Sequence, residues 1–361
     1  MVDKQILSNR LVTFRKELKN LGQDGVLITK RENYMYLSGF SGTSANLVIT
    51  DKKAYLLTDF RYVEQSARQS PLFEIVQHKP DIKDTILEII NSEGIKKLGF
   101  EDESLTYSEY KSFNDKFKDC TLEGIGSVVE RLRSIKDSFE IETINKAVEI
   151  ADGAFKHVLG IIKPGITELD VAAELEYQMK KLGASAASFE TIVASGLRSS
   201  MPHGVASEKK LEIGDTITMD FGALYNHYCS DITRTVFLGQ ADKKMIDIYN
   251  IVLEAQLTSE KGAVQGKTGR EVDKIARDII YGKGFEGKFG HGLGHGLGLE
   301  IHENPRLSPG GDKVLENNMA VTIEPGIYVE GLGGVRIEDT IIIRDDNPIV
   351  LTRSTKDLII L

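Results

Sequence analysis

The stretch from Thr216 to Phe237, TITMDFGALYNHYCSDITRTVF, constrains the fold more than any other part of the chain. Its two runs alternate apolar and polar residues with the period of two that is typical of a half-buried β-strand, and turn-forming residues lie between them. The pattern therefore predicts an antiparallel hairpin. A turn centred between Tyr225 and Asn226 would place Asp220 opposite Asp231, with their Cβ atoms about 4.5–5.5 Å apart. Two carboxylates at that distance repel each other unless a cation lies between them, and a metal ion is the obvious candidate.

The composition is that of an ordinary soluble globular protein, with 41% hydrophobic and 27% charged residues among 361. A chain of this length exceeds the usual single domain, so we expect two domains. No run approaches the roughly 18 consecutive apolar residues of a membrane span, and the N-terminus lacks the apolar core of a signal peptide. We therefore expect a cytoplasmic protein without a membrane partner.

The charge and the cysteines exclude two further classes of function. The net charge is −9 and the pI is near 5.5, whereas a nucleic-acid-binding surface requires clustered Lys and Arg. We therefore expect no nucleic-acid partner. Cys120 and Cys229 are the only cysteines and form no CxxC pattern, so neither a disulfide framework nor a zinc ribbon is expected.

The apolar periodicity divides the chain into an N-terminal α/β region, residues 1–128, and a C-terminal α+β region, residues 129–361. The boundary falls in a joint rich in Gly, Ser and Arg between Gly124 and Asp137. In the first region the pattern predicts helices over 7–21 and 82–93 and strands over 25–29, 45–50, 54–58 and 97–100. In the second it predicts helices that begin near Asp137, Thr167 and Thr268, and strands over 188–194, 319–324 and 335–343.

Two further carboxylates lie within apolar strands. In MAVTIEPG, Glu324 shares a face with Thr322 and stands where proline and glycine end the strand. In GVRIEDT, Glu338 shares a face with Arg336 and Thr340. A carboxylate embedded in this way costs several kcal/mol unless it is paired, protonated or bound to a metal ion.

A glycine-rich segment, GHGLGHGLGLEIHE, brings His291, His295 and His302 within twelve residues. With carboxylates elsewhere and no cysteine nearby, these nitrogens favour an open catalytic site for Mn, Co, Fe or Zn over a structural zinc site. Phosphate binding is a weaker alternative, because the chain has no GxxxxGK[ST] motif and the carboxylates would repel phosphate.

Together these motifs closely resemble the pita-bread metallopeptidases, in particular the branch of aminopeptidase P and prolidase. The resemblance rests on DFGxxYxxYxSDxTRT, GHGLGHGLGLEIHE, TIEPGIY and GVRIEDT, and it covers most of the chain from about Asp137 onward. Weaker matches, GFSGTSANLVIT and TDFRYVEQ, make the N-terminal region similar to the smaller α/β domain of that branch. The implied fold is α+β, with a creatinase N-terminal-like α/β domain over 1–128 and a pita-bread (creatinase/aminopeptidase-like) catalytic domain over 129–361.

The resemblance implies a dinuclear centre of two divalent metal ions, Mn²⁺ first, with Co²⁺ or Zn²⁺ as alternatives. Asp231, His295 and Glu324 would be ligands of one ion and Asp220 of the other, with Asp231 and Glu338 bridging both. Two ions about 3.5–4 Å apart share a hydroxide whose pKa they lower, and they polarise the scissile carbonyl.

The resemblance also implies three catalytic groups. His203, in MPHG, and His302, seven positions after His295, would hydrogen-bond the substrate carbonyl or the tetrahedral oxyanion. For His203 a structural loop histidine is the alternative. Glu324 would move a proton from the nucleophile to the leaving proline nitrogen.

Two further residues would support the site. His291 would line the pocket for the residue after the cleaved bond. Arg336 would orient the carboxylates, although a purely structural salt bridge is nearly as well supported by the sequence.

By this resemblance the chain is a metal-dependent exopeptidase that hydrolyses the N-terminal Xaa-Pro bond of dipeptides (prolidase) or of longer peptides (aminopeptidase P). Its partners would be a proline-containing peptide and a second copy of the chain, with the N-terminal domain shaping the entrance and the homodimer. The alternatives are a broader aminopeptidase or non-peptidase hydrolase on the same fold, and a non-catalytic peptide-binding relative. The intact ligand set counts against these alternatives, while the peptide length, the native metal and the preferred first residue stay open.

Overall fold

The computed structural model describes residues 2–361, and its contacts divide the chain after Arg133 into two compact units. The boundary expected after residue 128 lies at the beginning of α6 (Val128–Ser134), and the contacts divide at the other end of that helix.

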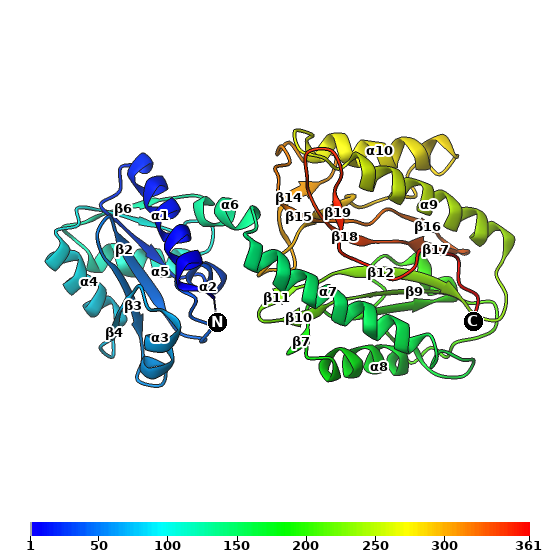
Figure 1. The fold of residues 1–361 in the computed structure, drawn as a ribbon, viewed down its shortest axis with the longest axis horizontal. Helices are drawn as coiled ribbons and strands as arrows, with labels where there is room; N and C mark the ends of the chain where they lie inside the picture. The colour runs from blue at the N-terminus through cyan, green and yellow to red at the C-terminus, as the bar shows by residue number, and fades with distance from the viewer. Residues whose placement is uncertain (1) are drawn as a thin grey trace. The chain divides into compact units, whose positions relative to one another are not determined.

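The first unit is built around a mixed six-stranded sheet with the order β4-β3-β2-β1-β5-β6 (Figure 1). β1 pairs antiparallel with β2 and parallel with β5. Its strands are β1 (Gly25–Ile28), β2 (Asn46–Thr50), β3 (Ala54–Thr58), β4 (Glu74–Gln77), β5 (Lys97–Phe100) and β6 (Thr121–Gly124). Its helices, besides α6, are α1 (Lys4–Leu21), α2 (Arg31–Ser38), α3 (Val63–Gln69), α4 (Ile82–Glu93) and α5 (Tyr107–Lys116). Apolar residues of β1, β2, β3, α4 and β5 form its buried core.

The second unit places antiparallel strands between two pairs of helices (Figure 1). The helices are α7 (Ser138–Val158), α8 (Glu168–Lys181), α9 (Lys243–Gly262) and α10 (Gly269–Gly282). α7 and α8 share a buried core with β8, β9 and β12, whereas α9 and α10 share another with β15, β16 and β17. The helices predicted to begin near Asp137, Thr167 and Thr268 are confirmed, and each of these residues forms a capping box at the start of its helix.

Four small sheets form the interior of this unit, with the orders β12-β9-β8, β11-β10-β7, β14-β13-β15-β18-β19 and β16-β17. The earlier strands are β7 (Ala186–Ala187), β8 (Ile192–Ser195), β9 (Thr216–Phe221), β10 (Ala223–Tyr225), β11 (Tyr228–Cys229) and β12 (Ile232–Phe237). The later ones are β13 (Gly294–Gly296), β14 (Glu303–Leu307), β15 (Ala320–Ile323), β16 (Gly326–Val329), β17 (Gly333–Arg336), β18 (Asp339–Ile342) and β19 (Ile349–Val350). A 3-10 helix, η1 (Gly196–Ser200), follows β8.

The predicted hairpin is confirmed, because β9 pairs antiparallel with β12. The predicted register is wrong. Asp220 lies opposite Thr233 and not opposite Asp231. Since the difference is two residues and side chains alternate with a period of two, both carboxylates remain on the same face of the sheet.

The turn explains the error. Asn226 and His227 have left-handed φ values of 46° and 71°, and Tyr225 pairs with Tyr228 across them. A two-residue turn with positive φ at both positions matches the twist of a hairpin. The turn is therefore centred one residue later than the sequence pattern indicated.

The strand expected over 335–343 is interrupted. β17 pairs with β16, whereas β18 pairs with β15 in a different sheet. Glu338 stands at the joint between them, and its backbone N–H donates to the carbonyl oxygen of Thr233 on β12 (3.1 Å). The interruption brings the Glu338 carboxylate next to the strand that follows Asp231.

The buried guanidinium of Arg234 stabilises the joint between β17 and β18. It donates to the carbonyl oxygens of Thr233 (2.9 Å) and Glu338 (2.5 Å) and to the carboxylate of Asp339 (2.7 Å), which also accepts from Lys356 (2.5 Å). Burial alone would raise the pKa of Asp339, but the charges of Arg234 and Lys356 hold it below its usual value. The carboxylate is therefore stable as an ion, and β12 and β18 are linked through it.

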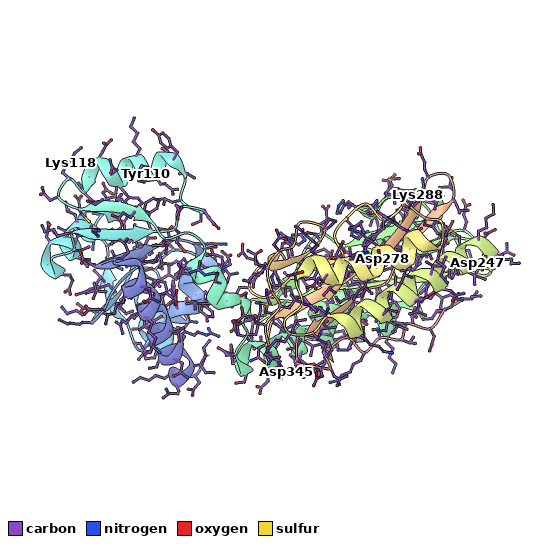
Figure 2. The ribbon with its side chains drawn as sticks, turned by 90° about the horizontal axis from the view of Figure 1, so that it is seen from above. Tyr110, Lys118, Asp247, Asp278, Lys288 and Asp345 are labelled. Atoms are coloured by element: carbon purple, nitrogen blue, oxygen red, sulfur yellow. The ribbon has the colours of Figure 1, made fainter. Side chains whose placement is uncertain are left out.

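The outer sides of α9 and α10 carry charged side chains that are exposed to solvent. Asp247 of α9 and Asp278 of α10 are exposed on their helices (Figure 2). Within residues 2–361, no helix is long and apolar enough to cross a membrane.

Gly222→Ala should destabilise the protein by about 3 kcal/mol or more. A Cβ at this position would lie 1.9 Å from the carbonyl oxygen of Ser230 and 2.2 Å from the hydroxyl of Ser188, so the hairpin backbone would have to move. Chemical denaturation measures the loss. Gly282→Ala is the matched control, because a Cβ at the end of α10 meets nothing within 4 Å. Equal stability of the two variants would contradict the close approach at Gly222.

Candidate metal centre

One pocket of about 330 Å³ in the second unit is lined by every residue that the sequence singled out as a ligand or a catalytic or supporting group. These residues are Asp220, Asp231, His295, Glu324, Glu338, His203, His302, His291 and Arg336. They come from segments far apart in the chain, including β9, the start of β12, β13, the end of β15 and the joint between β17 and β18. The fold therefore brings the whole set together.

Asp231, His295 and Glu338 form the tightest group, since a carboxylate oxygen or ring nitrogen of each lies within 4.8 Å of the others. His295 Nε2 lies 3.6 Å from Asp231 Oδ2 and 3.4 Å from Glu324 Oε1. Two ligand atoms that bind one ion at about 2.1 Å are themselves roughly 3–3.5 Å apart. The separations thus match atoms that share a metal ion.

Three buried carboxylate oxygens of residues that line the pocket lack a hydrogen-bond partner among the described residues: Asp220 Oδ1, Asp231 Oδ1 and Glu338 Oε1. Buried polar atoms are nearly always satisfied, so three orphaned oxygens in one pocket need an explanation. Carboxylate oxygens with one imidazole nitrogen are ligands that suit Mn, Co, Fe or Zn. The residues present therefore fit a divalent metal centre.

His295 is prepared to act as a ligand through Nε2. Its Nδ1 donates to the carbonyl oxygen of Gly296 (3.0 Å), which leaves a lone pair on Nε2, the atom that faces Asp231 and Glu324. Burial lowers the pKa of His295 to about 3, so the ring is neutral at neutral pH. Neutral imidazole is the form that binds metals.

The strand that carries His295 is held tightly in place. A Cβ on Gly294 would lie 2.0 Å from the carbonyl oxygen of Thr322 on β15, so only glycine allows this approach. The Thr322 hydroxyl accepts from the His295 backbone N–H (3.1 Å) and donates to Glu324 Oε1 (3.3 Å). One threonine therefore positions two of the candidate ligands.

The carboxylates raise one another's proton affinity. Burial raises the pKa of Asp231 well above its usual value, and the charges of Glu338, Asp220 and Glu324 add to this. The pKa of Glu338 is raised in the same way, by burial and then by Glu324 and Asp220. Burial raises the pKa of Glu324 to about 8. Without added positive charge, the group cannot keep all its carboxylates ionised at neutral pH.

Arg336 pairs with Asp220 and reaches two further groups. Its Nη2 donates to Asp220 Oδ2 (2.6 Å), and its Nη1 donates to the Tyr328 hydroxyl (2.8 Å) and to the carbonyl oxygen of Pro202 (3.2 Å). Tyr328 in turn donates to His291 Nε2 (2.9 Å), whose Nδ1 donates to a backbone carbonyl (2.8 Å). Burial lowers the pKa of His291 to about 4. Arg336 and a neutral His291 thus line the pocket, and the Tyr328 hydroxyl links the two side chains.

His203 and His302 are both exposed to solvent within the pocket. The rings of His302 and His295 meet edge to face with centroids 4.5 Å apart. Burial of its inner side lowers the pKa of His302 below the usual value, so the ring is neutral and able to donate an N–H. His203 follows Pro202, whose carbonyl oxygen Arg336 holds.

Sequence reasoning missed several residues that line this pocket. Phe189, Ile192 and Ile301 supply apolar surface, and Arg306 supplies a positive charge. Arg306 lies on β14 directly opposite His295. Its position four residues after His302 was visible in the sequence. Only the strand pairing reveals that its side chain lies on the same face of the sheet as that of His295.

Two protein-family models match the chain. The model described as metallopeptidase family M24 matches residues 142–345, and the creatinase/prolidase N-terminal domain matches residues 10–135. These matches confirm the expected architecture of a creatinase-type N-terminal domain followed by a pita-bread catalytic domain.

The similar proteins cover almost the entire chain. The Xaa-Pro dipeptidase of Pyrococcus furiosus is 42% identical over 98% of this chain and 100% of its own length. The solved structure of an Xaa-Pro dipeptidase from Bacillus anthracis is 49% identical, covers 98% of this chain and 100% of that one, and has a TM-score of 0.96. The X-Pro aminopeptidase structure from Thermotoga maritima is 38% identical, covers 97% and 99%, and has a TM-score of 0.91.

Glu338→Gln should stabilise the metal-free protein by about 1–3 kcal/mol, or a few degrees in Tm, because it removes one of the mutually repelling buried charges. The same change should reduce the rise in Tm that a divalent ion produces in the unchanged protein. Thermal unfolding with and without Mn²⁺ after chelation measures both effects.

The matched control is the adjacent residue. Asp339→Asn also removes a buried negative charge, but it leaves Arg234 and Lys356 without their partner, so it should lower Tm. A metal-free Glu338→Gln protein that is less stable than the unchanged protein would contradict the repulsion.

Proposed function

The chain belongs to metallopeptidase family M24, and we propose that it hydrolyses the bond before proline in Xaa-Pro dipeptides. It is an enzyme of the metallopeptidase class. Similar proteins over nearly the full length carry the name Xaa-Pro dipeptidase, which supports the substrate. One observation carries the proposal of hydrolysis: the orphaned oxygens of Asp231 and Glu338 beside the lone pair of His295.

We propose that two divalent ions, with Mn²⁺ as the first choice, bind Asp220, Asp231, His295, Glu324 and Glu338. The buried oxygens Asp231 Oδ1 and Glu338 Oε1, which have no hydrogen-bond partner among the described residues, support the part of these two carboxylates in holding the ions. When bound, such a centre supplies a water-derived nucleophile at neutral pH and withdraws electrons from the scissile carbonyl.

The histidines at the pocket surface would stabilise the developing oxyanion. His302 is a neutral donor next to His295, and His203 reaches the same pocket from the segment after η1. Donors placed where negative charge develops lower the barrier more than they strengthen substrate binding.

Glu324 would carry the proton to the leaving proline nitrogen. Its pKa, raised by burial to about 8, would fall when a cation binds beside it, so the carboxyl changes protonation within the range that proton transfer at neutral pH requires. Thr322 holds the carboxyl in place with a 3.3 Å hydrogen bond.

Arg306 supports a preference for dipeptides over longer peptides. In an Xaa-Pro dipeptide the carboxylate of proline lies within one residue of the scissile carbonyl, whereas in a tripeptide it lies roughly 3.3–3.6 Å further along the chain. Arg306 lies opposite His295 on the neighbouring strand and lines the same pocket, where it would bind the nearer carboxylate. The volume of about 330 Å³ lies at the lower end of the range for small-molecule sites.

We also propose a cytoplasmic homodimer. Cys120 and Cys229 form no disulfide, as a reducing compartment would require.

The protein loaded with Mn²⁺ should cleave Ala-Pro, and removal of the metal by a chelator should lower turnover by about 100-fold or more until Mn²⁺ is restored. Asp231→Ala should lower both metal content and turnover, whereas Asp247→Ala, an exposed change on α9, should alter neither. Full activity of demonstrably metal-free protein would overturn the mechanism, and unchanged metal content in Asp231→Ala would overturn the ligand assignment.

Arg306→Gln should lower kcat/KM for Ala-Pro by about 10- to 100-fold, because a charge-assisted hydrogen bond to the substrate carboxylate is lost. The value for Ala-Pro amide, which lacks that charge, should change little. Arg270→Gln, which breaks an exposed ion pair with Asp312, is the matched control.

Two results would contradict this reading. Equal losses for the acid and the amide would show that Arg306 does not bind the carboxylate. A higher kcat/KM for Ala-Pro-Ala than for Ala-Pro in the unchanged protein would favour an aminopeptidase over a dipeptidase.

A further inference from the structure

A single buried carboxylate holds both ends of the segment that carries His203. Glu168 is fully buried, 0% exposed, at the first turn of α8. Its Oε1 accepts from the backbone N–H (2.7 Å) and hydroxyl (2.8 Å) of Ser195, where the segment begins. Its Oε2 accepts from the backbone N–H (3.1 Å) and hydroxyl (2.6 Å) of Ser207, where the segment ends. Each oxygen therefore fixes one end of the same loop.

We call the hydrogen bonds of Glu168 to the two ends of the loop the clamp. Arg198 extends this clamp to the interior of the loop. Its Nη1 donates to Glu168 Oε2, and its Nη2 donates to the carbonyl oxygen of Val205 (2.8 Å), two residues after His203. The carboxylate of Glu168 thus has a cationic partner, which a buried charge requires. Through Arg198, the clamp reaches the half of the loop on which His203 lies.

The other side of the loop rests on the metal-centre strands. The Ser199 hydroxyl accepts from the backbone N–H of Gly334 on β17 (2.9 Å), and Arg336 donates to the carbonyl oxygen of Pro202 (3.2 Å). The segment is therefore held by Glu168 on one side and by β17 on the other. His203 itself projects into the pocket and is exposed.

We propose that Glu168 is a positioning residue that sets the place of His203 over the metal centre by closing the 195–207 loop. The proposal rests on the proposed function, because it takes His203 to contact the substrate carbonyl. Glu168 lines no part of the pocket and is no candidate ligand. It acts only through the loop.

The chemistry explains why a carboxylate is required. Four N–H or O–H donors and a guanidinium converge on two oxygens, and an ionised carboxylate is the one protein side chain that accepts at all these sites. A glutamine of the same shape would direct an NH₂ group at donors on one end of the loop. That end would be released, while the helix that carries residue 168 keeps its shape.

The test begins with Glu168→Gln in the metal-loaded full chain. Loss of orientation by about 1 Å at a catalytic group lowers rates by as much as 100-fold. We expect kcat for Ala-Pro to fall by about 10- to 100-fold, with KM and metal content changed less than about twofold, since no candidate ligand is touched. Asp170→Asn is the matched control, because it makes the same acid-to-amide change in the capping box of the same helix without contacting the loop.

A double-mutant cycle separates positioning from general destabilisation. In a His203→Ala background, Glu168→Gln should lower kcat by less than about twofold further, because the group that it positions is already absent. A full additional loss in that background would overturn the proposal. If Glu168→Gln does not fold, Ser207→Ala weakens one end alone, because it removes the hydroxyl donor, keeps the backbone N–H donor and leaves no unpaired buried charge. The same cycle with His203→Ala then applies.

Amide hydrogen exchange tests the clamp without any activity. Glu168→Gln should raise exchange across residues 196–206 by about tenfold or more relative to the unchanged protein and to Asp170→Asn. Unchanged exchange there would overturn the proposal. A chain that does not cleave Ala-Pro but shows the faster exchange would instead refute the proposed function and leave the clamp intact.

Discussion

Asp231, Glu338 and Glu324 converge on one point inside the second unit, and the charge on each opposes ionisation of its neighbours. The backbone and the packing around the site keep these carboxylates together in spite of their repulsion. The ligand atoms stand on strand ends and on a joint between strands, where short backbone segments limit how far a carboxylate can withdraw. The surrounding helices bury two apolar cores, one on each side, so relaxation toward water would expose core residues. A bound cation therefore relieves the repulsion between the carboxylates more readily than a movement of the backbone would.

Two apolar cores explain how such distant segments reach one pocket. α7 and α8 pack against the sheet that carries Asp220 and Asp231, whereas α9 and α10 pack against the strands next to Glu324 and Glu338. Each half therefore contributes two carboxylates, and the single imidazole comes from β13 in the five-stranded sheet. Arg234 links the halves, because it starts on β12 and donates to backbone and side chain at the beginning of β18. Neither half alone assembles a complete ligand set.

The sequence predicted elements well where local pattern decides them and poorly where pairing decides them. α4, β3 and β5 have the predicted bounds, because an apolar run between turn residues needs no distant partner to be recognised. The hairpin register was missed because the conformations of Asn226 and His227 decide it, and many residue pairs could supply such a turn. The break between β17 and β18 and the place of Arg306 were missed for the same reason: both follow from which strands pair.

Glu338 and Asp339 show that placement, and not residue type, creates the need for a metal ion. Both are acidic and fully buried, and they are adjacent in the chain. Asp339 faces Arg234 and Lys356, which hold its pKa below the usual value although burial opposes this. Glu338 points to the opposite side of the backbone, toward carboxylates, and its pKa is raised well above the usual value by burial and by their charge. The chain thus gives Asp339 two direct cationic partners. Near Glu338 the only cation among the causes of its pKa shift is Arg336, which pairs with Asp220 and does not offset the repulsion, so a bound cation is the remaining source of positive charge.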